Sequence, residues 1–288
     1  MGAVPELPEV ETVRRSLLDV LPGRAVVSVT RRRTDIIEGG RTGRHLLRGA
    51  VVDRLERRGK QLAIVAADGR TLCVHLGMSG QLLHLPRGAA PARADHIHLE
   101  WRLATPAASG SNGRADRPQS DGRLLFRDPR RFGGVWTFAS YAELTDTRWS
   151  LLGPDAAEIS PDQLGPRLER ARRPIKAALL DQSVLAGLGN IYADEALHLA
   201  RIAPDRLACD VRDVAALCAA IRATLGRAIE AGGSTLRDYV DSRGESGWFQ
   251  LKHAVYGRGG EPCRSCGRAL RSGSIAQRTT VWCKSCQQ

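Results

Sequence analysis

The sequence predicts an α+β protein with a β-rich first half, a helical second half and a small cysteine-rich hairpin at the end. Three observations predict this fold class: short β-prone runs separated by turn residues, later amphipathic helical patterns, and two closing Cys-x2-Cys pairs. A chain of 288 residues can bury more than one core without disulfide support. We expect three domains, at residues 1–145, 146–252 and 253–288.

The first half is expected to open with a helix and to continue as strands. The apolar residues that recur at helical spacing after Pro8 are Val10, Val13, Leu17 and Leu21. Several β-rich runs follow, and their number and spacing are typical of a sandwich or a barrel. The expected strands are residues 25–30, 50–55, 61–66, 71–76, 97–101, 123–126 and 135–138.

Helical patterns dominate the second half. We expect helices at residues 175–186, 191–200 and 211–231, the last with one continuous apolar face. A Gly-rich segment, residues 232–260, leads to the cysteines. In the first half, residues 104–122 have low complexity and no large apolar side chain, so we expect a mobile loop that extends a hairpin.

The charge balance indicates a polyanionic partner such as a nucleic acid. The formal net charge is +12, although a GC-rich genome also loads Arg into unrelated proteins. No apolar run approaches the roughly 20 residues that span a bilayer. The acidic, proline-containing N-terminus is unlike a secretory signal. We therefore expect a soluble, cytoplasmic protein with no membrane partner.

Four of the seven cysteines have metal-ligand spacing. Cys263 and Cys266, followed after sixteen residues by Cys283 and Cys286, match the pattern of a tetrahedral Zn²⁺ site. Four thiolates leave no open position for water, so we expect one structural zinc ion per chain. Two redox-active pairs are the alternative, but such motifs usually occur singly. The other cysteines have apolar neighbours and are expected to be core thiols: Cys73, Cys209 and Cys218.

Six sequence blocks resemble one known family. They are PELPEVETVRR (5–15), RRGK (57–60), HLGMSG (75–80), RDPRRFGG (127–134), GLGNIYADE (187–195), and YGRGGEPC with the closing cysteine pairs (256–286). The chain resembles the bacterial formamidopyrimidine-DNA glycosylases, which remove oxidised purines from DNA. The resemblance implies an N-terminal β-sandwich, a helix-two-turn-helix domain and a zinc-ribbon hairpin. It also implies a nucleoid-associated monomer that acts on duplex DNA containing oxidised purines or abasic sites.

The resemblance implies the catalytic residues. Pro5 matches a proline whose amine attacks the sugar C1′ and forms an iminium, which allows both phosphates to leave by β,δ-elimination. Glu6 matches the general acid that protonates the sugar ring oxygen, and this role needs a carboxyl group protonated near neutral pH. Lys60 matches a lysine that contacts phosphate and the damaged base. Residue type alone favours other interpretations. Pro5 would be a proline at the start of a strand, Glu6 a carboxylate at the N-terminus of a helix, and Lys60 a solvated lysine in a turn.

Four residues stand before Pro5, and they depart from the family pattern. A proline acylated by Val4 is an amide with no nucleophilic lone pair. We expect translation to begin at the codon of Val4, read as GTG, so that removal of the initiating methionine frees Pro5. If residues 1–4 were retained, the chain would be a non-catalytic protein that binds damaged DNA.

Further residues match DNA contacts of the family. Met78, Arg130 and Phe132 match side chains that fill the gap left by an everted nucleotide, and Arg130 also donates to the orphaned cytosine. Asn190, just before a predicted helix, and Arg278, between the cysteine pairs, match phosphate contacts. An ordinary helix N-cap is the alternative for Asn190.

A histidine segment departs from the family pattern as well. The family usually has His-Asp-His at a phosphate contact, and this chain has Ala94 before Asp95 and His96. We expect His96 to retain the phosphate contact. His98 is expected to be a strand residue.

The long polar loop at residues 234–250 bears on specificity. In the family such a loop covers the everted 8-oxoguanine, whereas residue chemistry alone allows a bland surface loop. An endonuclease VIII-like glycosylase for oxidised pyrimidines is the alternative enzyme, but the opening PELPE and this loop disfavour it. A zinc-ribbon transcription factor would explain the cysteines and none of the other blocks.

Overall fold

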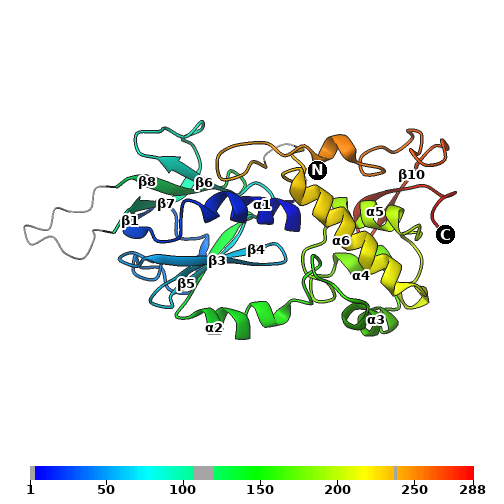
Figure 1. Cartoon of the computed structure of the whole chain (residues 1–288), viewed down its shortest axis with the longest axis horizontal. Coiled ribbons are helices and arrows are strands. Elements are labelled where there is room, and N and C mark those ends of the chain that lie inside the picture. Colours follow the sequence, from blue (N-terminus) through cyan, green and yellow to red (C-terminus); the bar gives the residue numbers. More distant parts are fainter. Residues whose placement is uncertain (1–3, 107–119, 237–238) are drawn as a thin grey trace, which may run out of the picture.

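The computed structural model describes residues 4–106, 120–236 and 239–288. Strands fill one half of the molecule and most of the helices the other, although the first helix runs from the junction of the halves across the strands and the helix at residues 141–146 lies against the strands (Figure 1). The C-terminal hairpin lies on the helical side. The predicted order of a β domain, a helical domain and a terminal hairpin is confirmed.

The two halves and the hairpin contain these elements. The helices are α1 (Leu7–Leu18), α2 (Tyr141–Asp146), α3 (Pro161–Glu169), α4 (Ile175–Leu180), α5 (Asn190–Leu199) and α6 (Val214–Glu230), with 3-10 turns η1 (Trp149–Leu151), η2 (Ala208–Asp210) and η3 (Phe249–Lys252). The strands are β1 (Ala25–Arg31), β2 (Ile37–Glu38), β3 (Val52–Arg58), β4 (Gln61–Ala66), β5 (Thr71–His75), β6 (Gln81–Pro86), β7 (Ile97–Ala104), β8 (Gly122–Arg127), β9 (Gly134–Phe138), β10 (Arg271–Ile275) and β11 (Arg278–Trp282).

The first half is a sandwich of two sheets, as predicted. One sheet has the order β1-β7-β8-β6 and the other has the order β2-β9-β5-β4-β3. Val26 of the first sheet, Ile64 and Leu72 of the second, and Val13 of α1 belong to one buried cluster. β7 and β8 form an antiparallel pair, which confirms the hairpin under the 104–122 segment. Residues 107–119 of that segment lie outside the described residues.

Besides the short 3-10 turns, two strands and two helices of the described residues were not predicted, and one predicted helix is too long. β2 has only two residues, β6 has a single buried residue, and α3 contains Gly165 and Pro166, which weaken a helical signal. α2 is one short helix of six residues. The helix predicted at 175–186 ends at Leu180, because the Asp181 carboxylate accepts the Ser183 backbone N–H at 2.9 Å and forms a turn.

Two of the three predicted core thiols are buried. Cys73 and Cys218 are 0% exposed. Cys209 is partly exposed at η2, so its assignment to the core was wrong. The apolar neighbours of Cys209 suggested burial, and Ala208 of the same turn is indeed 0% exposed, while the Cys209 side chain is left partly accessible.

Helix α1 contributes to the cores of both halves. Leu7 packs into the helical cluster with Leu188 and Tyr192, whereas Val10 and Leu17 belong to the sandwich cluster. The first turn of α1 therefore lies at the junction of the two halves. This position brings the residues around Pro5 next to α5.

Two further sets of contacts join the halves. Arg57 of β3 lies 3.0 Å from Glu11 of α1 and 2.7 Å from Asp155, which leads into the helical half. The 239–245 segment crosses back to the sandwich, where Tyr239 is buried and donates from its hydroxyl to the Glu9 backbone oxygen at 3.2 Å. Ser242 donates to Ser16 Oγ at 2.6 Å. The predicted 234–250 loop is thus attached to the sandwich, while residues 237–238 lie outside the described residues.

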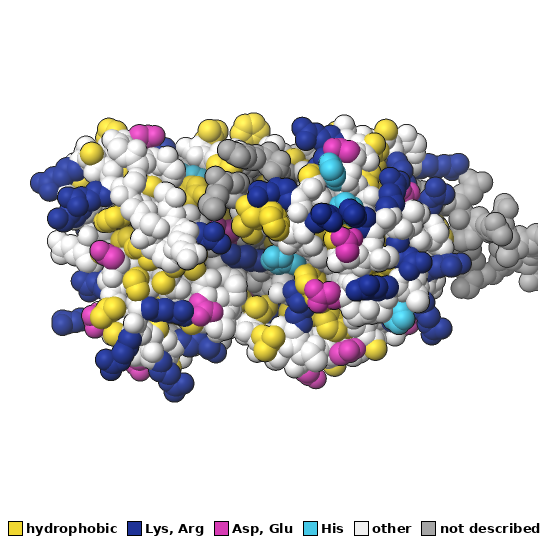
Figure 2. All heavy atoms as spheres, turned by 180° about the vertical axis from the view of Figure 1, so that it is seen from behind, with side chains coloured by type: hydrophobic (Ala, Val, Ile, Leu, Met, Phe, Trp, Pro, Cys, Tyr) yellow, Lys and Arg dark blue, Asp and Glu magenta, His cyan; other side chains and the backbone are white. Residues whose placement is uncertain are grey.

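Positive side chains are spread over the face shown in Figure 2. Lys and Arg side chains lie on both halves of this face. Asp and Glu side chains are fewer and lie among them. A polyanion could therefore be attracted to either half. Among the described residues, no helix combines the length and the apolar character needed to cross a bilayer.

Candidate active site and metal centre

Strand register brings three predicted site residues to one end of the five-stranded sheet. Gln61 at the start of β4 pairs with His75 at the end of β5, and His75 pairs with Gly134 at the start of β9. The segments just outside these residues therefore emerge at the same edge. They contain Lys60 before β4, Met78 after β5 and Phe132 before β9.

The buried Asp128 carboxylate joins two of these segments. It accepts the Ser79 hydroxyl at 2.6 Å and the Gly133 backbone N–H at 2.7 Å, and Asp128 is 0% exposed. Ser79 follows Met78, and Gly133 follows Phe132. Asp128 was not among the predicted site residues, although an Asp-Pro step in a Gly-bearing loop is a known turn signal.

The structure brings Met78, Arg130 and Phe132 into neighbouring turns. A Cβ on Gly77 would lie 2.3 Å from the Phe132 carbonyl carbon, so the two turns touch. The Arg130 guanidinium lies 4.8 Å from the centre of the Phe132 ring, and Phe132 is 54% exposed. A large exposed aromatic ring under a cation is available to stack on a base.

His96 lies beside the same loop. It has a positive φ of 58°, its backbone oxygen accepts the Asp128 N–H at 3.0 Å, and its exposed ring lies 3.3 Å from the Asp95 carboxylate. His98 is a buried residue of β7, as predicted, with Nε2 2.8 Å from the Asp128 backbone oxygen.

Glu6 lies at the N-terminus of α5. It caps α1, and its carboxylate accepts backbone N–H groups from Gly189 at 2.6 Å and Ile191 at 2.9 Å. Glu6 is only 2% exposed. Burial raises the pKa of Glu6 to about 7, against the lowering effects of the Lys60 ammonium and of the backbone donors. A carboxyl group that is half protonated at neutral pH can donate a proton.

Lys60 and Glu6 meet at Gly189. A Cβ on Gly189 would lie 2.4 Å from Glu6 Cδ and 2.7 Å from Lys60 Nζ, so only glycine leaves both groups in place. Lys60 lies in a tight turn with Gly59, whose φ is 56°. Burial lowers the pKa of Lys60, although the Glu6 and Glu9 carboxylates oppose this.

Pro5 is buried and directly precedes Glu6. Residues 1–3 lie outside the described residues. The interpretation of Asn190 as an N-cap is wrong, because Gly189 is the N-cap of α5 and Asn190 is the first helical residue. The Asn190 side chain instead donates to the Thr279 backbone oxygen of β11 at 3.0 Å.

Sequence reasoning missed a buried network around Glu9. The Glu9 carboxylate accepts the Tyr192 hydroxyl at 2.5 Å, the Ser234 N–H at 2.7 Å and the Glu6 N–H at 2.8 Å. These contacts fix the backbone of Glu6 between two halves of the chain. Glu9 lies in the PELPE block, three residues after Glu6, and this capping-box spacing was the available signal.

A buried ion pair holds the strand that carries Arg278. Lys176 Nζ lies 2.6 Å from Asp194 Oδ1 and donates to Thr280 Oγ1 at 2.8 Å. Lys176 is 0% and Asp194 2% exposed. Arg278 begins β11 after a tight turn at Ala276, and its own side chain is exposed. No local pattern in the sequence indicates this pair, because its partners lie far apart in the chain.

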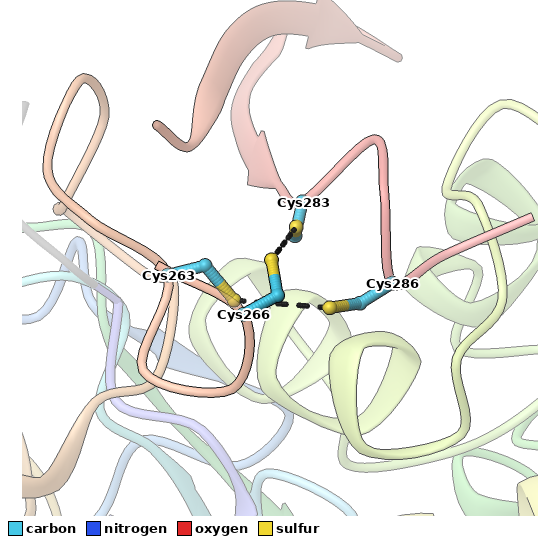
Figure 3. Close-up of side chains that lie close together, drawn as sticks. All are labelled: Cys263, Cys266, Cys283 and Cys286. Atoms are coloured by element: carbon cyan, nitrogen blue, oxygen red, sulfur yellow. Dashed lines mark hydrogen bonds between the residues drawn. The ribbon is translucent and has the colours of Figure 1, made fainter. Parts of the chain in front are cut away.

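The four predicted metal ligands lie together (Figure 3). Cys266 Sγ lies 3.5 Å from Cys283 Sγ, and Cys263 Sγ lies 3.9 Å from Cys286 Sγ. Four sulfurs at 2.3 Å from one tetrahedral zinc ion lie about 3.8 Å apart, so the donor set fits Zn²⁺. Cys263 and Cys283 are buried, as expected for a structural site.

Comparison with known families covers most of the chain. Three family models match: the formamidopyrimidine-DNA glycosylase N-terminal domain at residues 4–135, the H2TH domain of the same enzymes at 152–240, and a zinc finger found in FPG and IleRS at 260–288. This chain belongs to the formamidopyrimidine-DNA glycosylase family. The family resemblance and the single structural zinc site predicted from the sequence are therefore confirmed.

Full-length relatives of this family match closely. The formamidopyrimidine-DNA glycosylase of Desulfitobacterium hafniense is 38% identical over 290 residues, covering 99% of this chain and all of the relative. That of Xanthomonas oryzae pv. oryzae is 40% identical over 298 residues with the same coverage.

Solved structures of the family have the same fold. Lactococcus lactis Fpg bound to DNA containing an abasic site superposes with a TM-score of 0.84 at 32% identity, covering 98% of this chain and 99% of that one. The wild-type enzyme with DNA containing an N7-benzyl-Fapy-dG superposes with a TM-score of 0.83 at 32% identity, covering 99% of this chain and all of that one.

Proposed function

We propose that this chain is a bifunctional DNA glycosylase and abasic-site lyase that excises oxidised purines from duplex DNA in base excision repair. One observation carries the proposal: a buried carboxyl group with a pKa of about 7, on Glu6, adjoins Pro5 in sequence and Lys60 in space. The names of the relatives and their complexes with lesion-bearing DNA support the substrate class.

In the proposed reaction, the amine of Pro5 is the nucleophile. Its lone pair forms a bond to the sugar C1′, the bond from C1′ to the base breaks with its electron pair, and the departing base takes up the proton that the amine nitrogen loses. Protonated Glu6 transfers its proton to the ring oxygen, which opens the sugar and leaves an iminium. The iminium makes the C2′ proton acidic, and loss of protons then expels first one phosphate and then the other.

The neighbouring residues support binding roles. An ammonium such as that of Lys60 suits a phosphate or a carbonyl oxygen of the damaged base, and Arg278 and Asn190 at the hairpin and the α5 terminus suit phosphates. Met78, Arg130 and Phe132 lie on touching turns, and we infer that together they replace the everted nucleotide in the stack. His96 beside them is proposed to contact phosphate.

Borohydride trapping tests the reaction. The chemistry requires a free amine on Pro5, so a chain that begins at Pro5 should give a covalent adduct with a duplex containing 8-oxoguanine opposite cytosine. The same chain with Pro5 acetylated is the matched control and should give none. Intact mass of the natural protein should show Pro5 as the first residue.

Other outcomes would identify the alternatives. Tight binding by the Pro5-first chain with no adduct indicates a binding protein. Faster excision of an oxidised pyrimidine indicates the endonuclease VIII-like activity. A natural protein that retains residues before Pro5 and still cleaves oxidised DNA would mean that another amine is the nucleophile.

Removal of the metal is expected to weaken DNA binding. Cys266→Ser breaks the ligand set, so the β10–β11 hairpin loses its support and Arg278 loses its position. We expect affinity for a duplex with an abasic-site analogue to fall about tenfold or more, measured by fluorescence anisotropy alongside zinc content. Cys209→Ser, at a partly exposed cysteine outside the cluster, is the control. A zinc-free variant that binds like the wild type would contradict the prediction.

Three expectations stay predictions. We propose that the chain acts as a monomer and that it works on DNA in the cytoplasm, associated with the nucleoid. We also propose domain boundaries at residues 145 and 252. Limited proteolysis and sedimentation of the purified chain would examine the boundaries and the oligomeric state.

A further inference from the structure

A polar stripe on α5 faces the cysteine hairpin (residues 260–288). Asn190, Asp194 and His198 recur every four residues and therefore share one face of the helix. The first two hydrogen-bond the backbone of β11, at 3.0 Å and 3.1 Å. The third, His198, lies in the last turn, and its Nε2 is 3.7 Å from Cys263 Sγ. Each member of the stripe thus contacts a different point of the hairpin.

We propose that His198 supports the zinc site from outside its ligand set, with Nε2–H donating a hydrogen bond to the Cys263 thiolate. Four thiolates around one Zn²⁺ carry a net charge of 2−, and donors to the sulfurs disperse this charge. Cys263 is only 2% exposed, so water has little access to its sulfur. The Ser265 backbone N–H supplies one donor at 3.4 Å, and the imidazole supplies a second from a separate element.

The contact also links the hairpin to the catalytic end of the same helix. The first turn of α5 binds the Glu6 carboxylate, and the last turn carries His198. A helix of ten residues is about 15 Å long and bends little over that distance. The imidazole therefore fixes the metal centre to the element that also positions Glu6. His198 is a positioning residue in this proposal and touches no substrate.

Zinc release from the full chain tests the proposal. Replacing a residue that hydrogen-bonds a metal ligand typically lowers the affinity for the metal by about 10- to 100-fold. We expect His198→Phe, which keeps the ring bulk and removes the donor, to release zinc to 4-(2-pyridylazo)resorcinol about tenfold faster than the wild type. His198→Gln, whose amide N–H can reach the sulfur, should stay within about threefold. Leu199→Ala, at the adjacent residue that is 45% exposed, is the control.

A spectroscopic measurement separates the hydrogen bond from packing. In the Co²⁺-loaded chain, loss of a donor to sulfur should move the sulfur-to-cobalt band to longer wavelength in His198→Phe and not in His198→Gln. Should His198→Phe fail to fold, His198→Leu serves in its place. Equal release rates in all variants, or equally fast release from the Phe and Gln variants, would overturn the proposal. A wild-type Co²⁺ spectrum with only three thiolate ligands would overturn it too.

Discussion

Glu6→Gln is expected to lower the rate of base excision by about 10²- to 10⁴-fold while affinity for lesion-bearing DNA stays within about twofold. The amide has the shape of the carboxyl group but carries no acidic proton for the sugar ring oxygen. Single-turnover excision of 8-oxoguanine and anisotropy on the same duplex measure the two quantities. Glu158→Gln, at an exposed carboxylate, is the matched control. Unchanged excision in Glu6→Gln would exclude the general-acid role.

The same carboxyl group is expected to set the pH dependence of excision. Burial raises its pKa to about 7, so the protonated acid predominates below pH 7 and decreases about tenfold for each pH unit above it. The amine of Pro5 titrates in both proteins and loses its proton as pH rises, so the ratio of the wild-type rate to the Glu6→Gln rate isolates the carboxyl group. This ratio should fall between pH 7 and pH 9. A ratio that stays constant or rises through this range would contradict the assignment.

Gly189→Ala should be nearly as damaging as the loss of Glu6 itself. The backbone of Gly189, with φ of −132°, suits alanine, so the expected effect is steric. The new methyl group would lie 2.4 Å from Glu6 Cδ and 2.7 Å from Lys60 Nζ, and both groups must move. A displacement of about 1 Å in a catalytic group can cost about 10²-fold in rate.

A matched glycine makes this prediction specific. Gly226 lies within α6, and a Cβ there would have no neighbour within 4 Å. Gly226→Ala should leave excision unchanged and stabilise the fold slightly, because alanine has the higher helix propensity. Excision rates and melting temperatures of both variants are the measurements. Full activity of Gly189→Ala would show that Glu6 and Lys60 need not occupy this position.

Local patterns predicted the parts of the structure that depend on neighbouring residues. The β4 boundaries at Gln61 and Ala66 follow from a run of apolar residues between turns, and the cysteine cluster follows from spacing alone. The helix that ends at Leu180 was predicted to be too long, because the helical pattern of the sequence continues past it. The Asp181 carboxylate accepts the Ser183 N–H instead and forms a turn there. Local periodicity contains no information about that hydrogen bond.

The site depends on contacts between distant parts of the chain, and the sequence alone could not provide them. Capping preferences favour Asn190 over Gly189 as the N-cap of α5. The carboxylate of Glu6, which is distant in sequence, instead accepts the first N–H groups of this helix. Only a glycine at position 189 leaves room for this carboxylate. Asp128 was missed for the same reason, since its partner Ser79 lies forty-nine residues away.

The contacts that join the two halves have a consequence for how a lesion is reached. Arg57 holds α1 and Asp155 together, and the 239–245 segment ties the helical half to the sandwich. Opening the two halves about a hinge would break all of these contacts together. We therefore expect the protein to change shape little when it binds DNA. The DNA must then change shape instead of the protein. We expect the protein to bind first at duplex sites where kinking and unstacking cost the least free energy.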